Sequence, residues 1–351
     1  KQMKILLIGE FSGVHNNLKK GLAYFGHEVI LAADGDGYRG FDYDIKLTPY
    51  KGFFGGKIKN IFYFLFSLRK FIGYDVIQFI NPFSLPYYYY FVGITSILFK
   101  YNNKIIYYAC GTDPAFIASR DKFEYFPFSE ENSTEIPHYN KLKQKYYSWF
   151  INNISSIIPS MYTYGLGYFG NPKLSDPIPM PNSGNYGISN PNQKDVGKLK
   201  ILFGITRKEF KGADFILKAL EKIQGIYSEG VEITIVEKLP FEEYLDLLRQ
   251  TDVLIDQCKS YDYGMNAIFA LENGVIVFSG AEPIAMKYLS IQDSPVINIK
   301  PDSKQIFEQI KSLIKANDFS VLKKKSLEYA KNIHDVYIIA QRFLEYYDEI
   351  V

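Results

Sequence analysis

The chain has 351 residues, with 40 lysines and arginines against 38 aspartates and glutamates and a formal net charge of +2. This length suits two domains that each bury a core of their own. The nearly balanced charge excludes the strong basic surface of a nucleic-acid binder, so we expect no nucleic-acid partner. The two cysteines and four histidines follow no metal-ligand spacing, and so few cysteines fit a reducing, cytoplasmic setting.

The first half of the chain alternates apolar runs with helical periodicity, which predicts a parallel sheet with crossover helices. An uncharged run at 76–99 contains Gln78, Asn81, Pro82 and Pro86, and we interpret it as strand, loop and buried helix rather than a membrane span. The expected elements are a strand at 3–10, a helix at about 16–25, a strand at 27–33, a loop at 34–51, a helix at about 57–72, a strand at 75–80, a helix at about 87–99, a strand at 104–111, a helix ending near 151 and a strand at 155–160.

Two loops in this half follow strands, at the edge where open α/β sheets expose their ligands. The first, residues 9–17, reads GEFSGVHNN and lacks the GxGxxG spacing of dinucleotide-binding proteins, which argues against an NAD enzyme. The second, residues 107–114, reads YYACGTDP. Asp113 directly precedes Pro114, and this pair also favours a simple helix cap.

A basic, aromatic stretch at 57–71 reads KIKNIFYFLFSLRKF. The favoured interpretation is an ordinary crossover helix with its apolar face on the sheet. The alternative is a peripheral contact with an anionic membrane surface.

The segment from 170 to 200 is rich in Pro, Gly, Asn and Ser, which predicts the connection between two domains. The second half then repeats the alternation of strands and helices. The expected elements are strands at 199–204, 231–237, 252–257, 275–280 and 295–299, with helices between them and a last helix at 336–351.

In the second half, residues 203–220 read FGITRKEFKGADFILKAL. The pattern predicts a strand ending at Gly204, a loop with Arg207 and Lys211, and a helix beginning near Gly212. Cations would then lie beside helix amides, where a diphosphate binds. The alternative is a solvated basic loop.

Residues 261–280 read YDYGMNAIFALENGVIVFSG and predict a turn at Gly264, a helix through Leu271 and a buried strand. Tyr263, Gly264, Met265 and Asn266 stand at the start of that helix, where amides could hold a phosphate or a sugar. The alternative is a helix start packed at the domain interface.

These two segments resemble the C-terminal nucleotide-sugar domain of GT-B glycosyltransferases, in particular the retaining group, family 4, which includes many enzymes of bacterial surface-polysaccharide synthesis. The resemblance implies an α/β fold of two Rossmann-like domains with parallel sheets facing a central cleft. Residues 1–180 would be the acceptor-side domain, 181–335 the nucleotide-sugar-binding domain, and 336–351 a helix packing back on the first.

The activity that the resemblance implies is metal-independent transfer of a sugar from a nucleotide-sugar donor to a glycan or lipid-linked acceptor, as in capsule or lipopolysaccharide synthesis. No cofactor is expected beyond the donor itself. The protein would be cytoplasmic, with a peripheral position at the inner face of the membrane as the alternative.

The same resemblance suggests roles for individual residues in both halves. His15 and Gly13 would face the transferred sugar and the acceptor, with a histidine that merely closes its loop as the alternative for His15. Segment 107–114 is similar to the family's His-Gly-Ser-Asp stretch, with Cys110 at the histidine position, which makes Asp113 a candidate for sugar contact.

In the donor-side half, Arg207 and Lys211 would stabilise the leaving diphosphate, together with the amides near Gly204 and Gly264. Glu237 lies where the family encloses the nucleobase through backbone contacts.

The sequence also departs from the family, which carries two glutamates with seven residues between them. Tyr261 and Phe269 occupy those positions, while Glu272 lies in another helix register and Asp262 would fit only with a shifted loop. Glu282 is the candidate for a second carboxylate near the cleft. A phenylalanine cannot accept a hydrogen bond from a ribose hydroxyl. Two alternatives therefore stay open, a catalytically silent protein that binds a glycan or a partner transferase, and a sugar-nucleotide epimerase.

Overall fold

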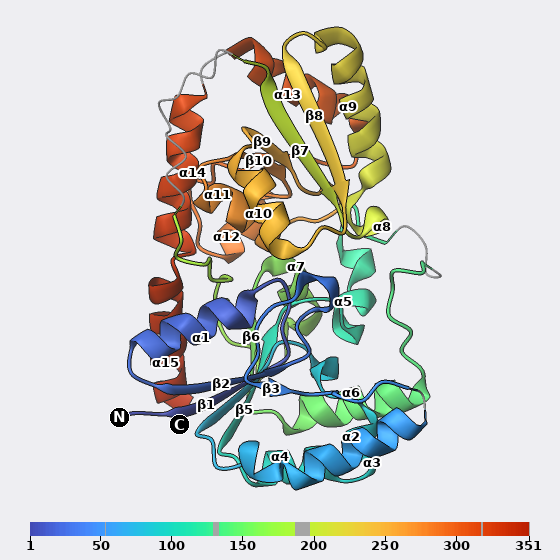
Figure 1. Cartoon of the computed structure of the whole chain (residues 1–351), viewed down its shortest axis with the longest axis vertical. Helices are drawn as coiled ribbons and strands as arrows, with labels where there is room; N and C mark the ends of the chain where they lie inside the picture. Colours follow the sequence, from blue (N-terminus) through green and yellow to red (C-terminus); the bar gives the residue numbers. More distant parts are fainter. Residues whose placement is uncertain (53, 129–132, 187–196, 317–318, 351) are drawn as a thin grey trace.

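The computed structural model describes residues 1–52, 54–128, 133–186, 197–316 and 319–350. Two parallel β-sheets flanked by helices form two lobes, one above the other in Figure 1. Part of the expected domain connection, residues 187–196, lies outside the described residues.

The N-terminal sheet has six parallel strands in the order β3-β2-β1-β4-β5-β6. Leu6 of β1 lies opposite Ile30 of β2 on one side and Ile77 of β4 on the other. Central strands of this kind are covered on both faces, which is why their residues form nearly continuous apolar runs. The strands are β1 Lys4–Ile8, β2 Glu28–Ala33, β3 Ile45–Lys46, β4 Val76–Phe79, β5 Lys104–Ala109 and β6 Ser156–Pro159.

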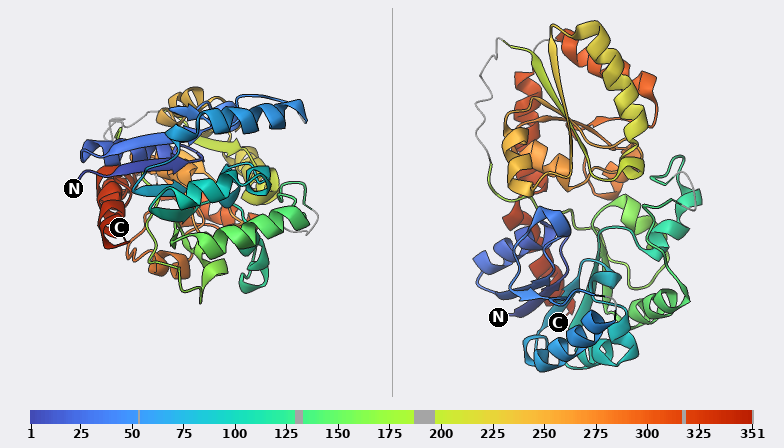
Figure 2. Two further views of the ribbon diagram at one scale, coloured as in Figure 1. Left: turned by 90° about the horizontal axis from the view of Figure 1, so that it is seen from below. Right: turned by 45° about the vertical axis from the view of Figure 1, so that its right-hand side comes forward.

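The C-terminal sheet has five parallel strands in the order β11-β10-β9-β7-β8. Leu202 of β7 pairs with Thr234 of β8 and with Leu254 of β9. Helices lie on both sides of this sheet, as the right-hand view of Figure 2 shows. The strands are β7 Leu199–Ile205, β8 Val231–Glu237, β9 Val253–Ile255, β10 Ile276–Ser279 and β11 Ile297–Asn298.

The crossover helices connect successive parallel strands in both lobes. Within the described residues no helix is both long and apolar enough to span a membrane. The N-terminal helices are α1 Val14–Tyr24, α2 Gly55–Phe66, α3 Tyr88–Phe91, α4 Ile94–Lys100, α5 Pro114–Ala118, α6 Lys141–Asn153 and α7 Tyr162–Gly165. The remaining helices are α8 Lys208–Lys211, α9 Ala213–Tyr227, α10 Phe241–Arg249, α11 Met265–Glu272, α12 Pro283–Tyr288, α13 Ser303–Ala316, α14 Ser320–Ile333 and α15 Val336–Ile350.

Several expected boundaries differ from the structure, two of them at glycines with positive φ. The helix expected at 87–99 is divided by Gly93, whose φ of 77° belongs to the left-handed region. A separate turn of helix, α8, precedes Gly212, where the sequence predicts a loop. The helix expected at 57–72 ends at Phe66 and is followed by a 3-10 turn, and the loop expected at 34–51 contains the short strand β3.

The last helix, α15, lies against α1 of the N-terminal lobe (Figure 1). A side chain at Gly21 of α1 would come within 2.6 Å of the Ala340 Cβ atom, so this close approach requires glycine. The Tyr347 hydroxyl donates to the Gln78 side chain over 2.7 Å inside the N-terminal lobe.

The two passages of the chain between the lobes meet at His334, just before α15. Asn182 donates its backbone amide to the His334 carbonyl over 2.7 Å, and the His334 ring bonds the Met180 carbonyl and the Tyr263 hydroxyl at 2.8 and 2.9 Å. Burial lowers the pKa of His334 to about 4, so the ring is neutral at physiological pH.

Candidate functional site

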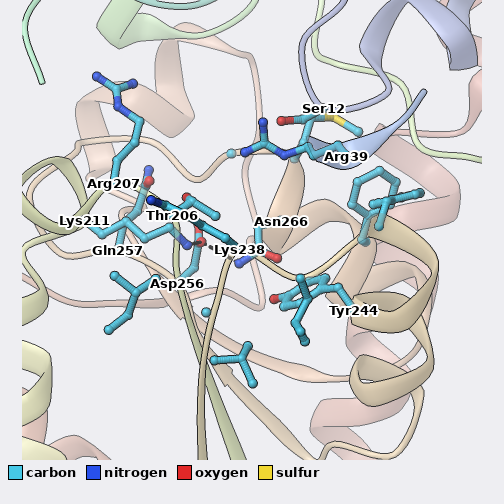
Figure 3. A pocket seen from close by; sticks show the side chains of 18 of the residues that line it. Ser12, Arg39, Thr206, Arg207, Lys211, Lys238, Tyr244, Asp256, Gln257 and Asn266 are labelled. Atoms are coloured by element: carbon cyan, nitrogen blue, oxygen red, sulfur yellow. Dashed lines mark hydrogen bonds and ion pairs between the residues drawn. The ribbon is translucent and has the colours of Figure 1, made fainter. Parts of the chain in front are cut away.

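A pocket with a cavity volume of about 210 Å³ lies between the lobes. Ser12, Arg39 and Phe41 reach it from the N-terminal lobe, and the ends of β7 and β9 and the starts of α10 and α11 supply the opposite side. Figure 3 shows Ser12 and Arg39 across the pocket from Lys211 and Asp256. The carboxyl ends of parallel strands are the usual place for a ligand in such sheets.

Four cationic side chains line this pocket with a single carboxylate, that of Asp256. The cations are Arg39, Arg207, Lys211 and Lys238. Three of them also lie near a carboxylate, Arg39 beside Asp36, Arg207 beside Glu135 and Lys211 beside Asp256. A lining with more cations than carboxylates still favours an anionic ligand.

Lys211 and Asp256 form a buried ion pair at one side of the pocket. The Lys211 ammonium lies 2.9 Å from the Asp256 carboxylate, and the two side chains are 8% and 2% exposed. The same carboxylate accepts hydrogen bonds from Asn266 over 2.8 Å and Ser279 over 3.2 Å. The charge of Lys211 is therefore already balanced, and the pair fixes Asn266 at the start of α11.

Arg207 stacks between aromatic rings rather than extending freely into solvent. Its guanidinium carbon lies 4.1 Å from the centre of the Phe210 ring and 5.4 Å from that of Phe128. Its Nη2 atom donates to the Thr112 hydroxyl over 3.4 Å, which joins the two lobes. The stacking holds the cation at the pocket wall.

Glu135 of the N-terminal lobe lies at the start of α8, within the segment that the sequence predicts as a loop carrying the phosphate-binding cations. The two Glu135 carboxylate oxygens accept the backbone amides of Glu209 and Phe210 over 2.9 and 3.0 Å. One of them also lies 4.0 Å from the Nε atom of Arg207. The structure thus places a carboxylate of the chain itself at the amides of α8, next to Arg207.

An aromatic wall made of Phe41, Phe241 and Phe269 closes the other end of the pocket. The ring centres of Phe41 and Phe241 are 4.7 Å apart, and those of Phe241 and Phe269 are 5.0 Å apart. Gly13 lies behind this wall, since a side chain there would come within 3.0 Å of the Phe41 ring. Phe269, at the position where the resemblance would place a ribose-binding glutamate, therefore presents an apolar surface.

Tyr261, at the other missing glutamate position, lies in a contact between the lobes. Its hydroxyl accepts the Glu124 amide over 2.8 Å, and its ring packs on Phe123 and Tyr125 at 5.1 and 4.8 Å between centres. The neighbouring Asp262 accepts the backbone amide of Thr163 over 2.8 Å, and its burial raises its pKa to about 6. Neither residue lines the interdomain pocket, so the shifted-loop replacement considered from the sequence is not what the structure shows.

A second cavity of about 740 Å³ adjoins the first and shares Ser12, Arg39 and Arg207 with it. It lies mainly against the N-terminal lobe, and its lining includes Phe83 and Tyr139, whose stacked rings are 5.1 Å apart. Aromatic faces next to polar groups suit a sugar or another ring-shaped acceptor.

Of the predicted site residues, six line the first pocket: Gly204, Arg207, Lys211, Gly264, Met265 and Asn266. The others lie outside both cavities: Gly13, His15, Asp113, Glu237, Tyr263 and Glu282.

His15 and Asp113 are buried and hold the N-terminal lobe together. The His15 ring bonds the Gly9 carbonyl at 2.7 Å and the Gln78 side chain at 3.2 Å, and burial lowers its pKa to about 4. Asp113 accepts the Phe116 amide over 2.7 Å and the Tyr107 hydroxyl over 2.6 Å, so it caps α5. These contacts match the loop-closing and capping alternatives for the two residues.

Tyr263, Glu282 and Glu237 have other surroundings. The Tyr263 hydroxyl bonds Tyr329 at 2.6 Å in the C-terminal core, and Glu282 accepts hydrogen bonds from Tyr125 and Asn298, each over 2.8 Å. Glu237 is exposed, while its neighbour Lys238 lines the pocket.

Four further residues of the pocket were not predicted from the sequence, namely Arg39, Asp256, Phe41 and Phe241. Asp256 had a usable signal, because it is an acidic residue at the end of the buried strand β9. Arg39 belongs to a loop without a recognisable motif, and its position depends on the Asp36 carboxylate 2.8 Å away. Within the described residues no three His, Cys, Asp or Glu side chains cluster as a metal site.

No protein-family model and no curated protein matches the sequence. Solved structures do match over nearly the whole chain. HepE from Anabaena in complex with UDP-glucose is 14% identical with a TM-score of 0.64, covering 99% of this chain and 100% of its own. Sucrose-phosphate synthase from Thermosynechococcus elongatus is 14% identical with a TM-score of 0.66, covering 99% and 98%.

A putative UDP-N-acetylglucosamine 2-epimerase from Listeria monocytogenes is 10% identical with a TM-score of 0.54, covering 98% and 95%. These similarities establish the fold. The chain has the GT-B architecture, with two Rossmann-like domains facing a central cleft, as the sequence predicts.

Proposed function

We propose that the protein is a glycosyltransferase that binds a nucleotide-sugar donor in the interdomain pocket. The observation that carries this proposal is that four cations line the pocket, Arg207, Lys211 and Lys238 on the segments after β7 and β8 and Arg39 on the opposite lobe. A nucleoside diphosphate is the anionic group that such a site suits, and HepE, of the same fold, was solved with UDP-glucose.

The sugar would pass to a hydroxyl of an acceptor in the adjoining cavity of about 740 Å³. Departure of the diphosphate develops negative charge, which Arg207, Arg39 and Lys238 of the pocket lining would stabilise without a metal ion. Lys211 acts through Asp256, which orients Asn266 at the helix start. An acceptor on a glycan or lipid carrier of a surface polysaccharide, such as capsule or lipopolysaccharide, fits this scheme, as does retention of anomeric configuration.

A thermal-shift screen with UDP, GDP, CDP, ADP and dTDP and their common sugars, with and without EDTA, tests the donor site. A ligand at a hundred times its Kd adds about 2.7 kcal/mol to the free energy of unfolding. We expect one base to shift the midpoint selectively and independently of EDTA. Arg207→Ala should lower the affinity for that ligand by at least about tenfold, because a charge-assisted contact contributes roughly 1.5–3 kcal/mol to binding.

Lys208→Ala is the matched control, since Lys208 lies one residue away with its side chain 64% exposed and paired to Asp214. Equal affinity in wild type and Arg207→Ala would show that the phosphate assignment is wrong. Absence of a shift with every nucleotide would favour a silent protein that binds a glycan or a partner transferase.

An epimerase is the second candidate, because structures of UDP-N-acetylglucosamine 2-epimerases share the fold. Incubation with the bound sugar nucleotide alone separates the two reactions. A new epimer without any acceptor would identify an epimerase, whereas sugar transfer that requires an added acceptor would identify a transferase.

A further inference from the structure

Helix α2 exposes a row of large apolar side chains to solvent. Ile58, Phe62, Leu65 and Phe66, here called the α2 face, are 50%, 56%, 43% and 86% exposed. Residues three, four and seven apart share one side of a helix, so these four form a continuous stripe. A contiguous apolar patch of this kind marks a site of interaction.

The stripe faces away from the sheet, contrary to the favoured interpretation of the sequence. The side of α2 that is buried carries Gly56, Asn60 and Phe64. Asn60 fastens the helix through two hydrogen bonds of 3.0 Å each to the backbone of Tyr50. Ile61 packs partly against the core beside Phe64, while the four large apolar side chains of the α2 face stay outside it.

The chain segment that carries this stripe has charges of one sign. Residues 46–74 contain six lysines and arginines and no aspartate or glutamate. Lys59 lies on α2 itself, and Arg69 and Lys70 follow directly after it, all three exposed. Basic side chains beside an apolar stripe are typical of a helix that lies in the interface of an anionic membrane.

The neighbouring helix α3 also exposes apolar side chains. Phe91 and Val92 at its end are 43% and 51% exposed. Helices α2, α3 and α4 lie together at the end of the N-terminal lobe that is farthest from the other lobe (Figure 1). The segment leading into α3, at Pro86 and Tyr87, lines the larger cavity, so the same segment touches both the surface and the cleft.

We propose that this end of the N-terminal lobe docks on an anionic phospholipid surface through the α2 face and its basic neighbours. Attraction between the cations and acidic headgroups would bring the helix to the bilayer, and the apolar side chains would then enter the headgroup region. A second copy of the chain is a poorer occupant, because symmetric pairing would bring the like charges of both copies together. This inference is independent of the chemistry in the cleft.

Flotation with vesicles of phosphatidylcholine alone, and of equal parts phosphatidylcholine and phosphatidylglycerol, tests the proposal on the full chain. We expect binding to the anionic vesicles, weakened by salt, because the Debye length falls from about 10 Å at 0.1 M to about 3 Å at 1 M. Phe62→Ser/Phe66→Ser should reduce the partition coefficient by at least about tenfold, and Lys59→Gln/Lys70→Gln by a similar factor.

Ile226→Ser/Val321→Ser is the matched control, because these apolar residues of the other lobe are 58% and 57% exposed. It should bind like wild type, and unfolding midpoints show that each variant is folded. The proposal is overturned if wild type stays unbound, if it binds neutral vesicles equally well, or if the two Phe substitutions leave binding unchanged. A dimer in sedimentation that Phe62→Ser/Phe66→Ser dissociates, without vesicle binding, would assign the face to a second copy instead.

Discussion

The two ends of the interdomain pocket differ in how they are built. At the charged end, Lys211 is held by Asp256 at 2.9 Å and Arg207 has Glu135 at 4.0 Å. At the aromatic end, Phe41, Phe241 and Phe269 form a wall without a polar group of their own. A ligand must therefore compete with carboxylates at one end, while at the other it meets a prepared apolar surface.

This difference shows which part of a donor each end can select. A cation that already pairs with a carboxylate of the protein contributes less free energy to the binding of a diphosphate than an unpaired cation would. The reason is that one attraction is exchanged for another. A ring that stacks on the aromatic wall loses only water. The charged end should hence determine whether an anion binds, and the aromatic end which ring accompanies it.

The largest expected effect comes from breaking the buried pair at the charged end. Lys211→Met leaves the Asp256 carboxylate buried without its counter-ion, and we expect the free energy of unfolding to fall by about 3–5 kcal/mol. Chemical denaturation measures this. Lys211→Met/Asp256→Asn should recover a substantial part of the loss, and a decrease below about 1 kcal/mol in the single variant would contradict a buried pair.

A smaller effect is expected from Glu135→Gln, and it is a gain in ligand affinity rather than a loss of stability. The substitution removes the negative charge at the amides of Glu209 and Phe210 while an amide oxygen can still accept a hydrogen bond. We expect nucleoside diphosphate to bind about fivefold more tightly, which corresponds to about 1 kcal/mol near a helix start. Titration calorimetry measures the change, with Glu124→Gln as the control because that side chain is 73% exposed. Weaker binding would mean that Glu135 supports the ligand instead of competing with it.

The smallest effect is expected at the aromatic end, from Phe241→Ala. Loss of this ring should weaken the binding of a nucleoside diphosphate by about 1 kcal/mol and leave the binding of pyrophosphate unchanged. Competition assays with the two ligands measure the difference. Phe66→Ala, in a ring 86% exposed on the other lobe, should affect neither. If Phe241→Ala lost equal affinity for nucleoside diphosphate and for pyrophosphate, the aromatic end would not select a ring, and the two ends of the pocket would not differ in what they bind.

The sequence predicted the alternating sheets and the start of α11, because buried parallel strands and a helix after Gly264 have strong local patterns. It did not predict the division of a helix at Gly93 or the outward stripe of α2. The first depends on one backbone angle, and the second on which side of the helix the Asn60 clamp attaches.

The candidate site was less accessible to prediction than the fold. Arg207 and Lys211 could be found, since both follow the end of a strand. Glu135 could not, because it meets Glu209 and Phe210 across 74 and 75 residues of sequence and from the other lobe. His15 and Asp113 have residue types that suit catalysis and folding equally, and only their burial separates the two uses.

His334 ties together both passages of the chain between the lobes, through bonds to Met180, Asn182 and Tyr263. In mechanical terms it is a junction: both crossings of the chain are fastened at one buried residue, so a displacement of one lobe against the other at this point would strain all of these bonds together.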